Sequence, residues 1–174
     1  FSTLSGLVKH NPDAAEDFLQ ELSAMYRYLV GDGLRHYVPL ADELRFVDHY
    51  VRLINYRYSG LTICISSELR STNAFVPPVS IQNLVENAVK HNSHGDDNHL
   101  QINVKRTKES VVISNNINKR KDDASGTKNG LSNLRQRFQL MTGKEIKVSN
   151  DGKTYMVAIP LIFDEDLSYE STDN

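Results

Sequence analysis

The sequence predicts an α+β fold: a two-layer sandwich in which helices cover one face of a mostly antiparallel sheet, preceded by a helical segment. Three observations predict it. Apolar residues recur at helical spacing as far as Tyr58, the spacing changes to short β-branched runs after Gly60, and two later pairs of such runs are joined by turns. Helices on one face of an antiparallel sheet form two layers around one core.

The first 60 residues form a separate helical unit in this prediction. Asn11-Pro12-Asp13 is a helix start, because Asn caps, Pro fits the first helical position and Asp complements the helix dipole. That helix ends at Gly31-Asp32-Gly33, where two glycines interrupt it. A second helix starts near Leu40 and is closed by Gly60. The apolar positions that define the two helices are Phe18, Leu22, Met25, Leu29, Leu40, Leu44, Val47, Val51 and Ile54.

Residues 61–163 are predicted to form the sandwich, and the acidic tail over 164–174 is expected to be disordered. One helix opens at Pro78 and runs to His91-Asn92, and another is closed by Gly143. The expected strands lie at 61–66, 100–104, 111–113, 146–149 and 155–159, and a polar stretch over 115–128 precedes the last helix.

Composition excludes several classes of protein. With 174 residues and 19.7 kDa, the chain fits one domain with a helical attachment. Its net charge of -2 argues against a general binder of nucleic acid or anionic membranes. Cys64 is the lone cysteine, so the sequence excludes an intramolecular disulfide and a Cys-based zinc site, and we expect its side chain to be buried and inert. No apolar run approaches the ~18 residues of a membrane span.

The densest group of polar residues lies on the helix after Pro78. Asn83, Asn87 and Lys90 follow at i, i+4 and i+7 and therefore share one face, with Glu86 beside them. Carboxamides next to a lysine can hold a hydrated cation and phosphate oxygens, because magnesium prefers oxygen ligands and keeps several waters. A merely solvated helix face explains the same spacing about equally well.

A second candidate is the polar stretch before the last helix. Gly130 precedes that helix, so backbone N–H groups there can face an anion, and a polar loop at this place is a plausible lid over phosphates. Taken alone, a solvated surface loop is the better interpretation, because glycine-rich loops are weak signals. The candidate residues are Asn115, Asn116, Lys119-Arg120-Lys121, Gly126, Lys128 and Gly130.

Several stretches, in order along the chain, resemble a known family. Asn83-Leu-Val-Glu-Asn87-Ala-Val-Lys90-His91 resembles the N box of histidine kinases. Together with Pro77-Pro78 it resembles the LytS/YehU-type sensor kinases, the histidine kinase internal-region family. The resemblance extends from residue 1 to about 163. Its other motifs lie at 21–28, 38–44, 50–58 and 130–138.

The resemblance implies the Bergerat-type ATP-binding fold, also called GHKL, with its catalytic centre on the helix after Pro78. Asn87 falls where the family binds magnesium through the carboxamide oxygen. Asn83 stands where related ATPases carry a glutamate that activates water. Since an amide is no general base at neutral pH, this substitution favours phosphoryl transfer over rapid hydrolysis. The residues expected to be catalytic are Asn83, Glu86, Lys90 and His91, of which Lys90 and His91 would lie near the phosphates.

The nucleotide site implied by the resemblance departs from the family at two places. Asn115 and Asn116 stand where an Asp-x-Gly-x-Gly box is usual; the amide oxygen of Asn115 can still accept a hydrogen bond from the adenine amino group, but the glycines are missing. Lys128 replaces the middle glycine of the lid. The expected ATP-binding residues are Asn83, Asn87, Lys90, His91, Asn115, Asn116, Gly126, Lys128, Gly130, Leu131 and Asn133.

By this resemblance, the chain is the cytoplasmic kinase core of a membrane-anchored bacterial two-component sensor. It would bind ATP with Mg²⁺, phosphorylate a histidine, and pass the phosphate to an aspartate of a response regulator, and its front helices would form a homodimer. Because Phe1–Val8 resembles the segment just after the family's acceptor motif, we expect the acceptor upstream of Phe1 and regard the chain, which has no initial Met, as a piece of a longer protein. His10 is interpreted as a helix-end residue. The membrane would be reached only through upstream segments, and no direct contact with nucleic acid is expected.

Two alternatives stay open. The weakened adenine box suits a degenerate ATP fold that serves as a dimeric signalling module without catalysis. A gyrase-like or heat-shock-type ATPase is disfavoured by Asn83. A metal site at His91, His94 and His99 is set aside, because no carboxylate or Cys stands at ligand spacing.

Overall fold

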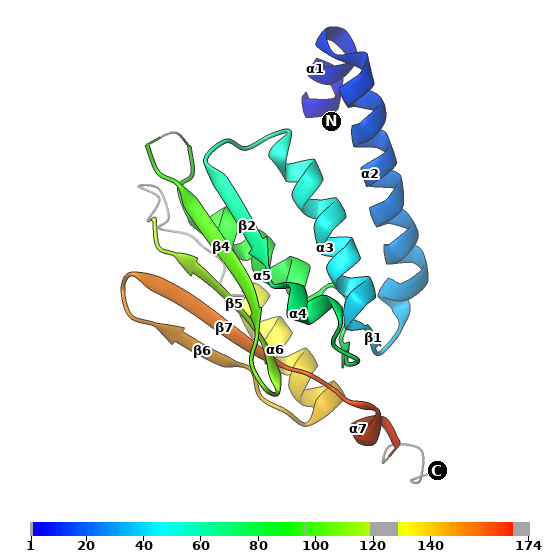
Figure 1. Cartoon of the computed structure of the whole chain (residues 1–174), viewed down its shortest axis with the longest axis vertical. Coiled ribbons are helices and arrows are strands. Elements are labelled where there is room, and N and C mark those ends of the chain that lie inside the picture. Colours follow the sequence, from blue (N-terminus) through cyan, green and yellow to red (C-terminus); the bar gives the residue numbers. More distant parts are fainter. Residues whose placement is uncertain (1, 96, 119–128, 169–174) are drawn as a thin grey trace.

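The computed structural model describes residues 2–95, 97–118 and 129–168 (Figure 1). The front of the chain is helical, as predicted. The side chain of Asn11 accepts a hydrogen bond from the backbone N–H of Ala14 at 3.2 Å, so it caps the second helix as expected, and the first helix ends at His10. The elements here are α1 (Ser2–His10), α2 (Pro12–Gly31), the short 3-10 helix η1 (Asp32–Leu34) and α3 (Leu40–Asn55).

The main sheet has five strands in the order β2-β4-β5-β7-β6. β2 pairs with β4 in parallel, and every other neighbouring pair is antiparallel, so the prediction of a mostly antiparallel sheet is confirmed. The strands are β2 (Leu61–Ile65), β4 (Leu100–Arg106), β5 (Ser110–Asn116), β6 (Lys147–Asn150) and β7 (Thr154–Pro160). A separate two-stranded pair, β1 (Val38–Pro39) with β3 (Phe75–Val76), was not predicted.

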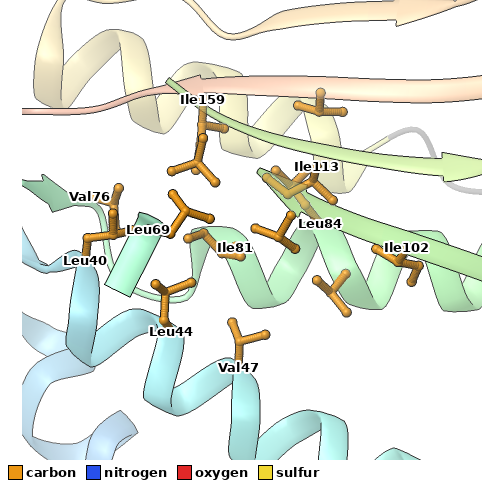
Figure 2. Packing of buried hydrophobic residues seen from close by; sticks show 14 of the residues in the cluster. Leu40, Leu44, Val47, Leu69, Val76, Ile81, Leu84, Ile102, Ile113 and Ile159 are labelled. Atoms are coloured by element: carbon orange, nitrogen blue, oxygen red, sulfur yellow. The ribbon is translucent and has the colours of Figure 1, made fainter. Parts of the chain in front are cut away.

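Helices and sheet form the two expected layers around one hydrophobic core. Figure 2 shows side chains of α3, such as Leu44 and Val47, pointing toward Ile81 and Leu84, with Ile113 of the sheet beyond them. α2 packs on the side of α3 that faces away from the sheet (Figure 1). The remaining helices are α4 (Ser67–Arg70), α5 (Ser80–His91), α6 (Asn129–Thr142) and α7 (Asp164–Ser168). α3 thus shares the core of the sandwich, while a domain boundary near residue 60 stays a prediction.

Three local expectations are corrected. Cys64 is exposed rather than buried, because Leu61, Ile63 and Ile65 alternate with it along β2 and take the inward-facing positions. The tail, expected to be disordered over 164–174, is helical over 164–168, and residues 169–174 lie outside the described residues. There Asp166 accepts hydrogen bonds from Lys144 at 2.8 Å and from the backbone of Phe163 at 2.9 Å. α5 starts at Ser80, two residues after Pro78.

None of the helices in the described ranges is both long and apolar enough to span a membrane.

Candidate functional site

α5 carries the polar residues predicted from spacing, and it presents them on one side. Asn83, Glu86 and Lys90 are exposed, and Asn87 and His91 are half-buried. The carboxylate of Glu86 accepts a hydrogen bond from the side chain of Gln82 at 2.7 Å. The opposite side of the helix is buried in the core through Ile81, Leu84, Val85, Ala88 and Val89. This apolar side fixes the rotation of α5 and therefore the direction of its polar side.

The first turn of α6 lies against Asn87. A Cβ atom placed on Gly130 would be 3.5 Å from Oδ1 and 3.7 Å from Nδ2 of the Asn87 carboxamide. Further along α6, the Arg137 guanidinium donates to the carbonyl of Pro78, just before α5, at 2.8 Å, so α5 and α6 run antiparallel. Leu131 packs against the core, and Asn133 is exposed. Two residues far apart in the sequence, Asn87 and Gly130, are therefore neighbours at one place.

The start of α5 has an unusual backbone and a cap from another helix. Val79 has φ of 66°, the left-handed region that β-branched residues rarely adopt. Its side chain cannot cap a helix, and Glu43 of α3 takes that role: the carboxylate accepts from the N–H of Val79 at 2.8 Å and from that of Ile81 at 2.9 Å. Glu43 also accepts from the Tyr28 hydroxyl at 2.6 Å.

Burial dominates the electrostatics of this cap. It raises the pKa of the fully buried Glu43 carboxyl, against the opposing effect of the hydrogen bonds from Tyr28 and from the backbone at Val79, Ile81 and Gln82. Burial also raises the pKa of Tyr28, and the negative charge of Glu43 adds to that shift. The largest cause of both shifts is the removal of the ionisable group from water.

Asparagine side chains connect the end of α5 to the segment that follows β5. Asn92 is buried; its amide nitrogen donates to the Ala88 carbonyl at 2.8 Å, and its amide oxygen accepts from the backbone N–H of Asn118 at 2.9 Å. The Asn118 amide donates in turn to the His99 carbonyl at 3.0 Å. α5 is thus held at its start by Glu43 and at its end by Asn92.

The two asparagines of the expected adenine box face different sides of β5. Asn115 is buried on the same face as Val111 and Ile113, toward the helices, and its amide nitrogen donates to the Asn116 carbonyl at 2.7 Å. Asn116 points to the other face, where its amide oxygen accepts from the backbone N–H of Gln101 at 2.7 Å and its nitrogen donates to the His99 carbonyl at 2.8 Å. Asn115 is therefore the one placed inside the sandwich.

Of the three histidines that were set aside as metal ligands, His94 and His99 have other neighbours. The rings of His94 and Tyr58 are in edge-to-face contact at 4.5 Å between centroids, and Nε2 of His99 lies 2.8 Å from the Thr62 hydroxyl. Across the described ranges, no three His, Cys, Asp or Glu side chains are grouped as a metal site would require. The expected magnesium ligand, Asn87, is a carboxamide and is therefore not among the residue types of such a group.

Part of the expected site lies outside the described residues, namely Lys119-Arg120-Lys121, Gly126 and Lys128. Sequence reasoning missed Glu43, Arg137 and Asn92 as supports of α5. Glu43 carried a signal: in Leu40-Ala-Asp-Glu43-Leu44 it occupies a position at core spacing, where a charged residue needs partners.

Comparison with known proteins gives the class. Residues 1–61 match the histidine kinase family. The sensor histidine kinase/phosphatase LytS of Staphylococcus aureus strain MRSA252 is 32% identical over 181 residues, which cover 91% of this chain and 31% of that protein. LytS of strain Mu50 is 31% identical with the same coverage. The chain spans about a third of the length of these relatives.

Solved histidine kinases are also similar in structure. A histidine kinase domain from Erythrobacter litoralis EL346 is 16% identical with a TM-score of 0.49, covering 92% of this chain and 85% of that one. The histidine kinase AdeS of Acinetobacter baumannii is 15% identical with a TM-score of 0.47, covering 84% and 77%. The sequence matches decide the assignment: the chain belongs to the histidine kinases and is of the LytS sensor type.

Proposed function

We propose that this chain is the kinase core of a two-component sensor, which binds ATP with Mg²⁺ and transfers a phosphoryl group to a histidine that precedes Phe1. The phosphate then passes to an aspartate of a response regulator. The observation that carries this proposal is the approach of the α6 N-terminus, at Gly130, to the carboxamide of Asn87 on the polar side of α5. It supports the interpretation of this side as a site and weakens that of a merely solvated face.

The residues at this place fit a magnesium nucleotide. The half-buried carboxamide of Asn87 offers the oxygen ligand that Mg²⁺ prefers, and the absence of a side chain on Gly130 leaves space beside it. Backbone N–H groups in the first turn of α6 suit phosphate oxygens. Magnesium, when bound, would neutralise charge on the phosphates. The exposed Lys90 adds positive charge on the same side.

The side chains on α5 favour transfer over hydrolysis. Asn83 lies one turn before Asn87 and cannot take a proton from water, so it can orient but not act as a general base. Phosphoryl transfer needs positioning and charge stabilisation more than covalent help from the protein. We assign orientation to Asn83 and phosphate contacts to Lys90 and His91, with Glu86 the nearby carboxylate of this centre.

The base and the lid complete the proposal. Asn115, buried on the helix-facing side of β5, is our candidate for the adenine contact, and Asn116 supports the strand through its two backbone partners. Gly126, Lys128, Leu131 and Asn133 belong to the proposed lid and its border. A homodimer through the front helices, a cytoplasmic location and an anchor in the membrane through upstream segments are further parts of the proposal.

Binding of a non-hydrolysable ATP analogue tests the site. Calorimetric titration of the chain with and without Mg²⁺ should show binding that requires the metal. Asn87→Ala removes the proposed ligand and should abolish the gain from Mg²⁺. Asn103→Ala is the matched control, because Asn103 lies on β4 between the inward-facing Ile102 and Val104 and so faces away from α5.

The second candidate, a degenerate ATP fold without catalysis, is favoured by the missing glycines around Asn115 and by the structural use of the Asn116 amide. If the wild-type chain shows no Mg²⁺-dependent binding at millimolar nucleotide, this candidate replaces the kinase. If Asn87→Ala responds to Mg²⁺ as the wild type does, the assigned ligand is wrong. Steady ATP hydrolysis without an acceptor histidine would contradict the role given to Asn83.

A further inference from the structure

The carboxylate of Glu43 joins three helices at one buried point. It belongs to α3, it accepts from the Tyr28 hydroxyl of α2 at 2.6 Å, and it accepts from the N–H groups of Val79 and Ile81 at the start of α5. These donors are all neutral groups. A buried charge that depends on neutral donors is sensitive to the loss of any one of them, because the remaining donors must compensate for it.

The start of α5 needs this carboxylate for two reasons. The N–H groups of a helix start have no partners within the helix, and Val79, as the capping residue, has no side-chain acceptor to offer. Val79 also has φ of 66°, a conformation that persists only where the surroundings hold it. The Glu43 carboxylate accepts from the N–H of Val79, and the Arg137 guanidinium donates to the carbonyl of the preceding Pro78.

The same carboxylate connects this start to α2. The ring of Tyr28 is stacked on Phe46 of α3 at 4.3 Å between centroids, so its hydroxyl is directed at Glu43 by packing. The Tyr28 hydroxyl of α2 and the Val79 N–H before α5 donate to the same oxygen, Oε2 of Glu43, so a shift of α2 along α3 would remove one of the two donors to that oxygen. Asn83 and Asn87 lie one and two turns beyond the capped residues, on the helix that Glu43 holds.

We propose that Glu43 is a positioning residue through which α2 sets the position of α5 and thereby of Asn83 and Asn87. This inference rests on the proposed function in so far as α5 is the nucleotide helix. With the Tyr28 hydroxyl in place, the carboxylate has all of its hydrogen-bond donors, and α5 is held in the position that binds the nucleotide. When α2 moves and the hydroxyl leaves, the buried carboxylate loses one of its donors and becomes less stable at this place, so the cap that it gives to Val79 and Ile81 weakens.

Tyr28→Phe isolates this link, because it keeps the ring on Phe46 and removes only the hydroxyl. Backbone amide hydrogen exchange in the nucleotide-free chain should rise about fivefold over residues 79–87. Affinity for the ATP analogue with Mg²⁺ should fall by a similar factor. Glu21→Gln is the matched control: Glu21 also joins α2 to α3, through His49 at 2.5 Å and Arg52 at 2.6 Å, but these partners lie on α3 alone.

The outcomes separate the inference from the proposed function. Unchanged exchange over 79–87 in Tyr28→Phe overturns the link, and so does an equal rise in Glu21→Gln, since that would be general loosening between α2 and α3. A wild-type chain that binds no nucleotide overturns the proposed function, while the exchange comparison still decides whether α2 is coupled to α5. Faster exchange with unchanged affinity overturns the positioning role.

A double variant tests whether Tyr28 acts through Glu43. Glu43→Gln has nearly the same shape but carries an amide group toward the N–H donors, so it should loosen α5 and weaken binding more than Tyr28→Phe does. The double variant should bind the ATP analogue only slightly more weakly than Glu43→Gln alone, because the carboxylate that accepts from the Tyr28 hydroxyl is already absent. Additive losses would show two independent effects and contradict the proposal.

Discussion

At Gly60, both the backbone conformation and the neighbouring atoms exclude a side chain. Its φ is +65°, and a Cβ atom there would lie 2.1 Å from the carbonyl oxygen of Gly95. Since backbone atoms cannot swing away as a side chain can, Gly60→Ala must move the loop at Gly95 away from the end of the α3 segment. We expect the free energy of unfolding to fall by more than about 2 kcal/mol, measured by urea denaturation.

Gly143 provides the matched control for that change. It has nearly the same backbone angle, φ +63°, but no atom lies within 4 Å of a Cβ placed on it. Gly143→Ala should therefore show the backbone strain alone and cost about 1 kcal/mol. If the free energy of unfolding falls equally in the two variants, the close contact with Gly95 does not contribute to the loss.

At the scale of elements, the end of α5 depends on one buried side chain. Asn92→Ala would leave the Ala88 carbonyl and the Asn118 N–H without their amide partners. We expect a loss of about 2 kcal/mol in the free energy of unfolding, because buried polar groups without partners keep their desolvation penalty. Amide exchange should also rise at the C-terminal turn of α5 and at residues 116–118, as NMR can show.

Asn98→Ala is the comparison, since Asn98 is an exposed asparagine of the same loop. It should leave both stability and exchange close to the wild-type values. If Asn92→Ala behaves like Asn98→Ala, the hydrogen bonds of Asn92 do not hold the end of α5, and the backbone alone fixes this loop.

Elements with a clear local period could be predicted from the sequence. α2 is marked by Asn11-Pro12 at its start, α3 by apolar residues on one stripe, and both hairpins by alternation and turns. The pair β1–β3 could not be predicted, because two-residue strands have no period and form only where distant segments meet. Cys64 was placed inside by residue type, although the period of two through Leu61, Ile63 and Ile65 assigns it to the outer face.

The candidate site divides in the same way. The polar side of α5 was predictable because four residues repeat on a helix whose other side is apolar. Its neighbours were not: the approach of Gly130 to Asn87, the cap from Glu43 and the left-handed Val79 depend on how distant helices pack. For Glu43, the sequence shows a charged residue at core spacing, but it does not show which groups donate hydrogen bonds to its carboxylate.

At the scale of the whole molecule, α2 leaves an apolar stripe uncovered. Leu19, Leu22, Tyr26 and Leu29 are exposed and follow at intervals of three, four and three residues. This is the a/d spacing of a helix that packs against another helix along a seam. The other side of α2 is already occupied by α3, so the stripe is free to meet the same stripe of a second copy, as the proposed homodimer requires.

Leu22→Lys tests that dimer, because it places a charge in the middle of the stripe without touching the core. Leu22 is 45% exposed, so the fold should survive, while a lysine in an apolar seam should raise the dimer dissociation constant at least about tenfold. Sedimentation equilibrium over a range of concentrations measures this constant directly.

Leu140→Lys is the control for this change. It introduces the same charge on α6, at a residue that is 78% exposed, and should leave the dimer dissociation constant unchanged. A dimer that tolerates Leu22→Lys, or is weakened as much by Leu140→Lys, would have to form through a surface other than this stripe on α2.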